Sequence, residues 1–151
     1  MAVKLITDSG CDLSATQAEE LGVILVPMTI RFEEGEFRSG FDLTTEEFFD
    51  KLAQAKELPT TSQPTPAAFE AEYEKIRANG DQAVVVCISS ALSGTYQSAM
   101  IAADEYGDCI YVVDTKNVTI GQRILLEYAM ELISKGHSAK KIAEILENVK
   151  A

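Results

Sequence analysis

Residues 83–98 read AVVVCISSALSGTYQS, an apolar run that changes abruptly into hydroxyl-bearing side chains. The opening residues, three of them valine, predict a strand that is buried on both faces. The remainder combines serine, glycine and threonine, and a helical pattern begins at about Thr95. A strand that empties into such a turn before a helix leaves backbone N–H groups free beside the hydroxyls. The stretch therefore predicts an anion-binding turn, although hydroxyls in this place also serve as ordinary helix caps.

The rest of the chain alternates strand and helix patterns. We expect strands at residues 3–7, 23–32, 36–38, 83–88 and 108–114, and helices at residues 14–21, 44–55, 65–78, 95–106, 120–135 and 138–149. Pro27 should bend or break the second strand. Strands and helices at this spacing predict an α/β domain with a mainly parallel sheet, whose ligands bind at the carboxyl ends of the strands.

Composition excludes several classes of protein. The length of 151 residues fits one domain, and the net charge of −11 argues against nucleic acid or an anionic membrane as partner. No apolar run approaches about 18 residues, so we expect no stable membrane insertion. Residues 1–6 turn polar too soon for a secretion signal. The three cysteines form no CxxC pair, which favours a cytoplasmic location and argues against disulfides or zinc.

A second hydroxyl-rich stretch, LPTTSQPTP, occupies residues 58–66. Its three prolines predict a stiff loop. Thr65 and Pro66 suit the start of the next helix, but Thr61 and Ser62 are not needed for that cap. Two hydroxyl-rich turns that converge would supply neutral donors to one small acidic group, such as a carboxylate.

Catalytic and metal-binding interpretations find less support. Ser93 follows a strand as a nucleophile would, but its flanks do not match GxSxG, and His137 is the only histidine that could act as its base. Asp8, Asp12 and Asp114 follow strands, yet no phosphate-binding loop accompanies them, so we predict no metal.

Three motifs in this order resemble the DegV family of fatty-acid-binding proteins. They are TDSxxDL at residues 7–13, PTTSQP at residues 59–64 and ISSxLSGTYQSA at residues 88–99. The resemblance covers the whole chain and implies that residues 1–151 form the N-terminal, three-layer α/β domain of a two-domain protein. Residues 113–121 are a looser version of a fourth family motif.

The resemblance also implies a function. A long-chain fatty acid would lie between the two domains, with its carboxylate bound by Thr61 and Ser93 and assisted by Ser62 and Gly94. The protein would be a bacterial carrier without catalytic residues and without a cofactor other than the bound fatty acid. It would present the fatty acid to a separate fatty acid kinase subunit, which makes the acyl phosphate used in phospholipid synthesis.

The second domain of the family is absent from this sequence, which is therefore expected to be a fragment or a short paralogue. A histidine expected in that domain is not matched by His137. Apolar surface left by the missing domain would be free for self-association. The alternative functions are a hydrolase with Ser93 as nucleophile and an interaction domain that binds a small anion.

Overall fold

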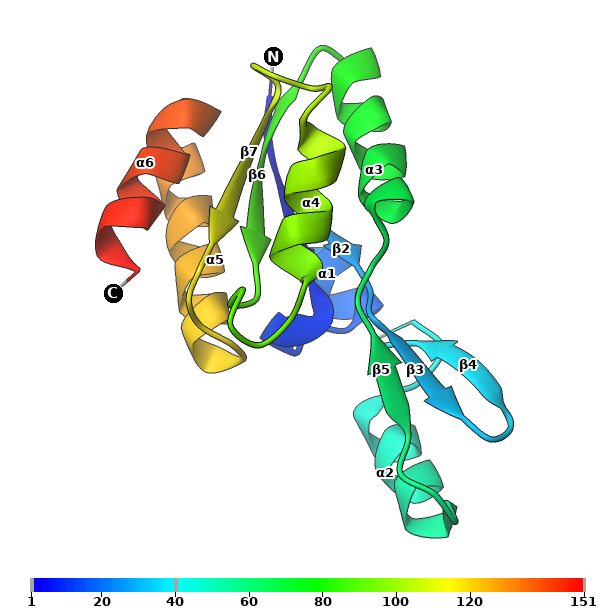
Figure 1. Ribbon diagram of the computed structural model, residues 1–151. Coiled ribbons are helices and arrows are strands. Elements are labelled where there is room, and N and C mark those ends of the chain that lie inside the picture. The colour runs from blue at the N-terminus through cyan, green and yellow to red at the C-terminus, as the bar shows by residue number, and fades with distance from the viewer. Residues whose placement is uncertain (1, 40, 151) are drawn as a thin grey trace.

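The computed structural model describes residues 2–39 and 41–150, and its chain folds into two sheets. In chain order the elements are β1 (Val3–Asp8), a 3₁₀ turn (Ser9–Cys11), α1 (Ala15–Leu21), β2 (Val23–Val26), β3 (Thr29–Phe32), β4 (Gly35–Arg38), α2 (Thr45–Gln54), β5 (Thr60–Ser62), α3 (Pro66–Ala78), β6 (Gln82–Cys87), α4 (Thr95–Ala103), β7 (Ile110–Asp114), α5 (Ile120–Ser134) and α6 (Ala139–Val149). Figure 1 shows this arrangement.

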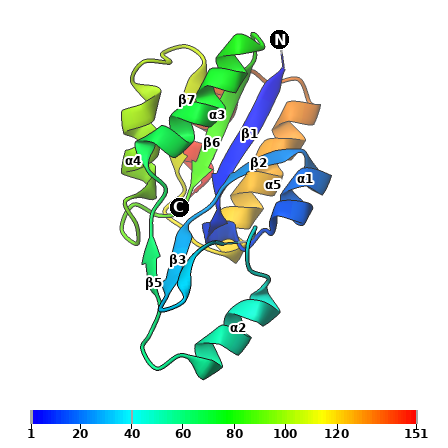
Figure 2. The same ribbon diagram turned by 90° about the vertical axis from the view of Figure 1, so that its right-hand side faces the viewer.

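The main sheet has four parallel strands in the order β2-β1-β6-β7, with helices on both faces. Alternate side chains of β6 pack into two separate cores, because successive residues of a strand face opposite sides. Val84 and Val86 pack with α5 and α6, whereas Val85 and Cys87 pack with α3 and α4. Figure 2 shows α1 beside α5, on the other side of the sheet from α3 and α4. The predicted three-layer α/β fold is therefore confirmed.

A small antiparallel sheet, β4-β3-β5, projects from this body together with α2 (Figures 1 and 2). Ile30, Phe32 and Leu43 form its buried core, and Phe37 and Phe48 pack against them. The Phe32 and Phe48 ring centroids are 6.0 Å apart. The small sheet thus has a hydrophobic core of its own.

Two local predictions need correction and one is confirmed. The segment 23–32 does break at Pro27, and its halves join different sheets: Pro27 has no N–H to donate, and the Met28 N–H bonds the Ser9 hydroxyl at 2.9 Å. The prediction of a loop for all of residues 58–66 was wrong, because Thr60–Ser62 pairs with β3 as β5. The helix after β6 ends at Ala103, earlier than expected.

The helices differ in how their first turns are capped. Ser14, Thr44, Thr65 and Ser138 cap α1, α2, α3 and α6 through their side chains, as the sequence pattern predicts. Within residues 2–39 and 41–150, α4 and α5 have no side-chain cap, and these two helices follow the carboxyl ends of β6 and β7. None of the described helices is long and apolar enough to cross a membrane.

Leu126→Ala tests the core between the main sheet and α5. Leu126 is fully buried, so we expect the free energy of unfolding to fall by about 2–5 kcal/mol in urea denaturation. Ile124, on the same helix, is 59% exposed. Ile124→Ala should change the free energy of unfolding by no more than about 0.5 kcal/mol. Equal losses in the two variants would contradict the packing described above.

Candidate functional site

The turns that follow β1, β6 and β7 meet at one edge of the main sheet, which we call the carboxyl edge. The Ser89 N–H donates to the Asn117 carbonyl at 2.8 Å, and the Thr119 N–H donates to the Gly10 carbonyl at 2.8 Å. The Ser90 N–H donates to Asp114 Oδ1 at 3.1 Å. The turn at residues 89–94 is therefore held by the turn after β7, which is itself bonded to the turn after β1.

Asp8 is a structural residue of this edge. Its carboxylate is buried and accepts hydrogen bonds from the Gly10 N–H (2.8 Å), the Gln122 side-chain amide (3.0 Å) and the Ile88 N–H (2.8 Å). Burial raises the pKa of the Asp8 carboxyl, although the hydrogen bonds from Gln122, Ile88 and Gly10 oppose the shift. Gly10 has no room for a side chain, since a Cβ would lie 2.8 Å from Asp8 Oδ1.

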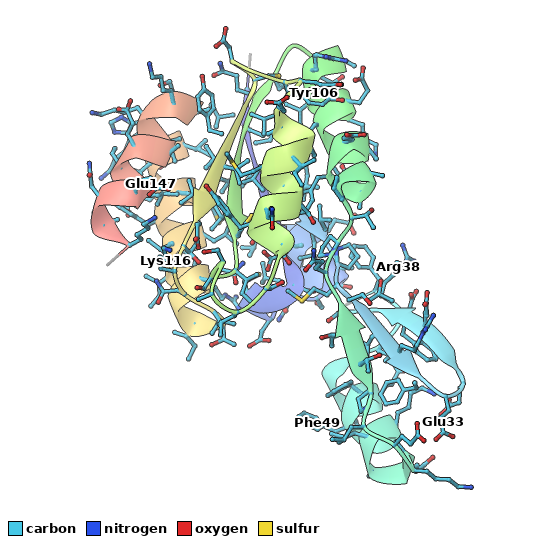
Figure 3. All side chains as sticks on the ribbon, in the orientation of Figure 1. Glu33, Arg38, Phe49, Tyr106, Lys116 and Glu147 are labelled. Atoms are coloured by element: carbon cyan, nitrogen blue, oxygen red, sulfur yellow. The ribbon has the colours of Figure 1, made fainter. Side chains whose placement is uncertain are left out.

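Asp114 balances the positive charge of the third turn. Burial alone would raise the pKa of the Asp114 carboxyl. Hydrogen bonds from Ser90 and Lys116 and the positive charge of Lys116 outweigh this effect, so the pKa lies below its usual value. The Lys116 ammonium lies 3.4 Å from Asp114 Oδ2, and Figure 3 shows Lys116 beyond the end of β7. Among the described residues, no group of three His, Cys, Asp or Glu side chains is placed to hold a metal.

The start of α4 carries free donors beside Ser93. The Ser93 hydroxyl lies 2.8 Å from the Thr95 hydroxyl and accepts the Thr95 N–H at 3.2 Å. In the part of the chain that the structure describes, the N–H groups of Tyr96 and Gln97 have no hydrogen-bond partner. Because free N–H groups at a helix start carry partial positive charge, this end of α4 favours an anion.

Gln63 joins the second hydroxyl-rich stretch to this turn. Its Oε1 accepts the Gly94 N–H at 3.1 Å, and its Nε2 donates to the Ser98 hydroxyl at 3.5 Å. The structure therefore brings Gln63, which directly follows β5, to the start of α4. Sequence reasoning did not assign Gln63 a role, and its place between Ser62 and Pro64 was the only available signal.

Thr61 and Ser62 leave β5 on opposite faces. Thr61 pairs with Ile30 across the antiparallel ladder, so its side chain lies on the face that Ile30 presents to the small core. Ser62 points to the other face, because side chains alternate along a strand. Both residues are exposed. Of the two, Thr61 is the one that shares a face with apolar residues.

A groove of about 940 Å³ lies between the small sheet with α2 and the 9–20 segment. We call it the apolar groove after its side chains Leu13, Ile30, Leu43, Phe48 and Phe49. Figure 3 shows Phe49 on α2, and this side chain is 59% exposed. Ile30 lines the groove and pairs with Thr61 across the β3–β5 ladder, so Thr61 lies on the same face of the small sheet as one wall residue of the groove.

The geometry does not support a Ser–His pair. His137 follows α5, whose first residue lies at the carboxyl edge and whose length is 15 residues. At the usual rise this helix spans about 22 Å, so His137 lies near the opposite end of the sheet from Ser93. His137 therefore lies too far from Ser93 to act as the base of a hydrolase.

Comparison with known proteins shows the family of this chain. The family model described as "Uncharacterised protein, DegV family" matches residues 2–151. The chain belongs to the DegV family. A DegV domain-containing protein from Deinococcus radiodurans is 36% identical over 149 residues, which cover 99% of this chain and 53% of the relative. The chain thus spans about half the length of the curated relatives it matches.

Solved structures of DegV proteins share the fold. A DegV family protein from Thermus thermophilus, described as binding fatty acid, superimposes with a TM-score of 0.88 at 34% identity and covers 99% of this chain and 54% of its own. DegV from Bacillus subtilis, described as a fatty acid binding protein, gives a TM-score of 0.88 at 31% identity, with 99% and 54% covered. These two DegV proteins are therefore described as binding fatty acids.

Asp8→Asn tests the buried carboxylate. Since the pKa of Asp8 is raised in the folded chain, its contribution to stability is fully present below the ordinary value of 3.8 and is lost as the pH rises through the folded value. We therefore expect the unfolding free energy of the native chain, taken relative to Asp8→Asn, to decrease from below pH 3.8 toward neutrality. Urea unfolding at a series of pH values measures it, and an increase would contradict the shift.

Proposed function

We propose that this domain binds the carboxylate of a long-chain fatty acid between β5 and the start of α4. The observation that carries the proposal is the Gln63 bridge, which holds the two hydroxyl-rich stretches together at a helix start with free N–H groups. The Thr61 and Ser93 hydroxyls and the Gly94 N–H are the donors in this proposal. Ser62, on the other face of β5, is given a smaller and indirect part.

The donors are neutral, which suits a chain of net charge −11. In this proposal the carboxylate takes the place of Gln63 Oε1 on the Gly94 N–H, since both are acceptors of the same kind. The bond from Gln63 Nε2 to the Ser98 hydroxyl then keeps the two stretches together. Hydrogen bonds to a charged group are worth about 1.5–3 kcal/mol each, so three such donors together with the helix start suffice for specific binding. No chemistry at the carboxylate is assigned to this chain, which acts as a carrier and not as an enzyme.

The apolar groove is the proposed path for the acyl chain. One of its lining residues, Ile30, pairs with Thr61 of β5, and in this proposal the acyl chain runs from the Thr61 face into the groove. Burial of apolar surface contributes roughly 25 cal/mol per Å², and a long acyl chain offers most of its surface to such a groove. The fatty-acid-binding DegV proteins described above support this assignment by their shared fold.

We also propose that a second domain contacts exposed apolar side chains beside the carboxyl edge. Leu92 and Ile120 are 63% and 74% exposed beside the carboxyl edge, and we assign them to contact with the second domain that the length of the relatives implies. Without such a domain the same side chains are available for self-association. We further propose that this cytoplasmic carrier presents the fatty acid to a separate kinase subunit for acyl phosphate formation and phospholipid synthesis.

Thr61→Ala and Ser93→Ala test the carboxylate site. Each variant removes one hydrogen bond to a charged group, so the dissociation constant for palmitate or oleate should rise about tenfold or more. Ser62→Ala is the matched control, with an expected change of no more than about threefold. Isothermal titration measures binding, and lipid mass spectrometry of the purified chain identifies what it carries.

Two results would count against the proposal. The first is loss of binding in Ser62→Ala equal to that in Thr61→Ala. The second is covalent labelling of Ser93 by a fluorophosphonate, which would favour the hydrolase alternative. Circular dichroism of each variant shows whether the fold is retained.

A further inference from the structure

The outer edge of β7 is an open strand edge. β7 is the last strand of the main sheet and pairs only with β6 among the described residues. The Cys109 carbonyl and the Thr115 N–H bond to β6 at 2.9 and 3.2 Å. Because backbone groups two residues apart point the same way, the N–H and carbonyl groups of Ile110, Val112 and Asp114 face outward. The Asp114 carbonyl accepts the Lys150 ammonium at 3.1 Å.

Nothing among residues 2–39 and 41–150 hydrogen-bonds the outward groups of Ile110 and Val112. Proteins usually protect such an edge with charge, proline, a bulge or a covering element, since an open edge pairs readily with another strand. The other edge strand of this sheet, β2, has only four residues and is followed by Pro27. The β7 edge is therefore the more available of the two.

The helices beside this edge leave it accessible. A shallow groove of about 310 Å³, which we call the edge groove, runs along β7 between α4 and α6. Its walls are Met100 and Ala103 of α4, Asp104 directly after α4, Ile110, Tyr111 and Val112 of β7, and Ala143 of α6. The alanines carry no long side chain to overhang the strand. Met100, on the α4 side of the groove, is 45% exposed.

We propose that the occupant of the edge groove is a second copy of this chain, paired β7 to β7 in antiparallel fashion. A two-fold axis near Val112 places Val112 opposite its own copy and Ile110 opposite Asp114 of the other chain. These are the outward residues on both strands, so the ladder bonds are made without disturbing β6. The result is one continuous sheet of eight strands across two chains, twice the four of one main sheet.

The charges of α6 favour this partner. α6 runs in the same direction as β7, since Lys150 at its end reaches Asp114 at the end of β7 (Figure 1). The two-fold axis therefore sets two α6 helices antiparallel. Lys140 and Glu147 lie three residues before and four residues after Ala143, on the stripe that lines the edge groove. Lys140 of each copy then faces Glu147 of the other.

Figure 3 shows Glu147 on α6, and both Lys140 and Glu147 are exposed. The Glu147 carboxylate accepts Lys150 of its own chain at 2.5 Å, so Lys140 of the other copy would be a second cation on this carboxylate. The ion pairs act twice because the interface is symmetric, whereas a partner of unrelated sequence would match them only by accident. Lys140 lies in the first turn of α6, where a cation opposes the helix dipole. A partner's carboxylate would offset this unfavourable placement. The inference does not rest on fatty-acid binding, because no donor of the carboxylate site takes part.

Val112→Pro tests the edge directly. Proline removes only the outward N–H of an edge residue, so β6–β7 pairing should survive. The native chain is expected to show twice its 16.4 kDa mass by light scattering, whereas Val112→Pro should show the mass of one chain with unchanged circular dichroism. A monomeric native chain, or a Val112→Pro variant that stays dimeric through another face, overturns the proposal.

Lys140→Glu tests the choice of partner and does not depend on how β7 tolerates proline. The substitution favours the α6 dipole, so the helix should not lose stability, yet the dimer dissociation constant should rise at least about tenfold. Glu147→Lys in the same chain should restore pairing in the double variant Lys140→Glu, Glu147→Lys. Sedimentation equilibrium measures all of these constants. Failure of the double variant to recover overturns the antiparallel arrangement of α6.

Discussion

The carboxylate of Asp8 is the contact on which the carboxyl edge depends. It accepts the N–H of Gly10 from its own turn, the N–H of Ile88 from the end of β6 and the side-chain amide of Gln122 from α5. A single buried group therefore fixes three segments that are far apart in the sequence. Its cost is desolvation, visible as a raised pKa, and its donors offset part of that cost. Without this contact the 89–94 turn would lose its registration with the turn after β1.

The anion site illustrates how an acidic protein can bind a carboxylate. With a net charge of −11 the overall field is repulsive, so attraction has to come from short-range groups. Free N–H groups at the start of α4, the Gly94 N–H and nearby hydroxyls are such groups. The Lys116 charge at the same edge is paired with Asp114 and adds little. An anion of this site is therefore recognised by hydrogen-bond geometry more than by charge.

The main sheet could be predicted from the sequence because its strands are locally distinct. The run at residues 83–88 has no polar interruption, and the helix caps at Ser14, Thr44 and Thr65 are read directly from residue type. The strand Thr60–Ser62 could not be predicted, since three polar residues between prolines become a strand only through β3, about thirty positions earlier. The role of Gln63 could not be predicted for a similar reason, because its partner Gly94 is distant in sequence.

The break at Pro27 also affects how ligand preference can change. Thr61 belongs to the small sheet and Ser93 to the main one, and each sheet has its own hydrophobic core. The spacing between the two hydroxyls is therefore set by how two separately packed bodies are seated against each other, and Gln63 fastens that seating. Substitutions deep in the small core, at Phe32 for example, can alter this spacing while every donor stays intact. Ligand preference can thus evolve at positions that never contact the ligand.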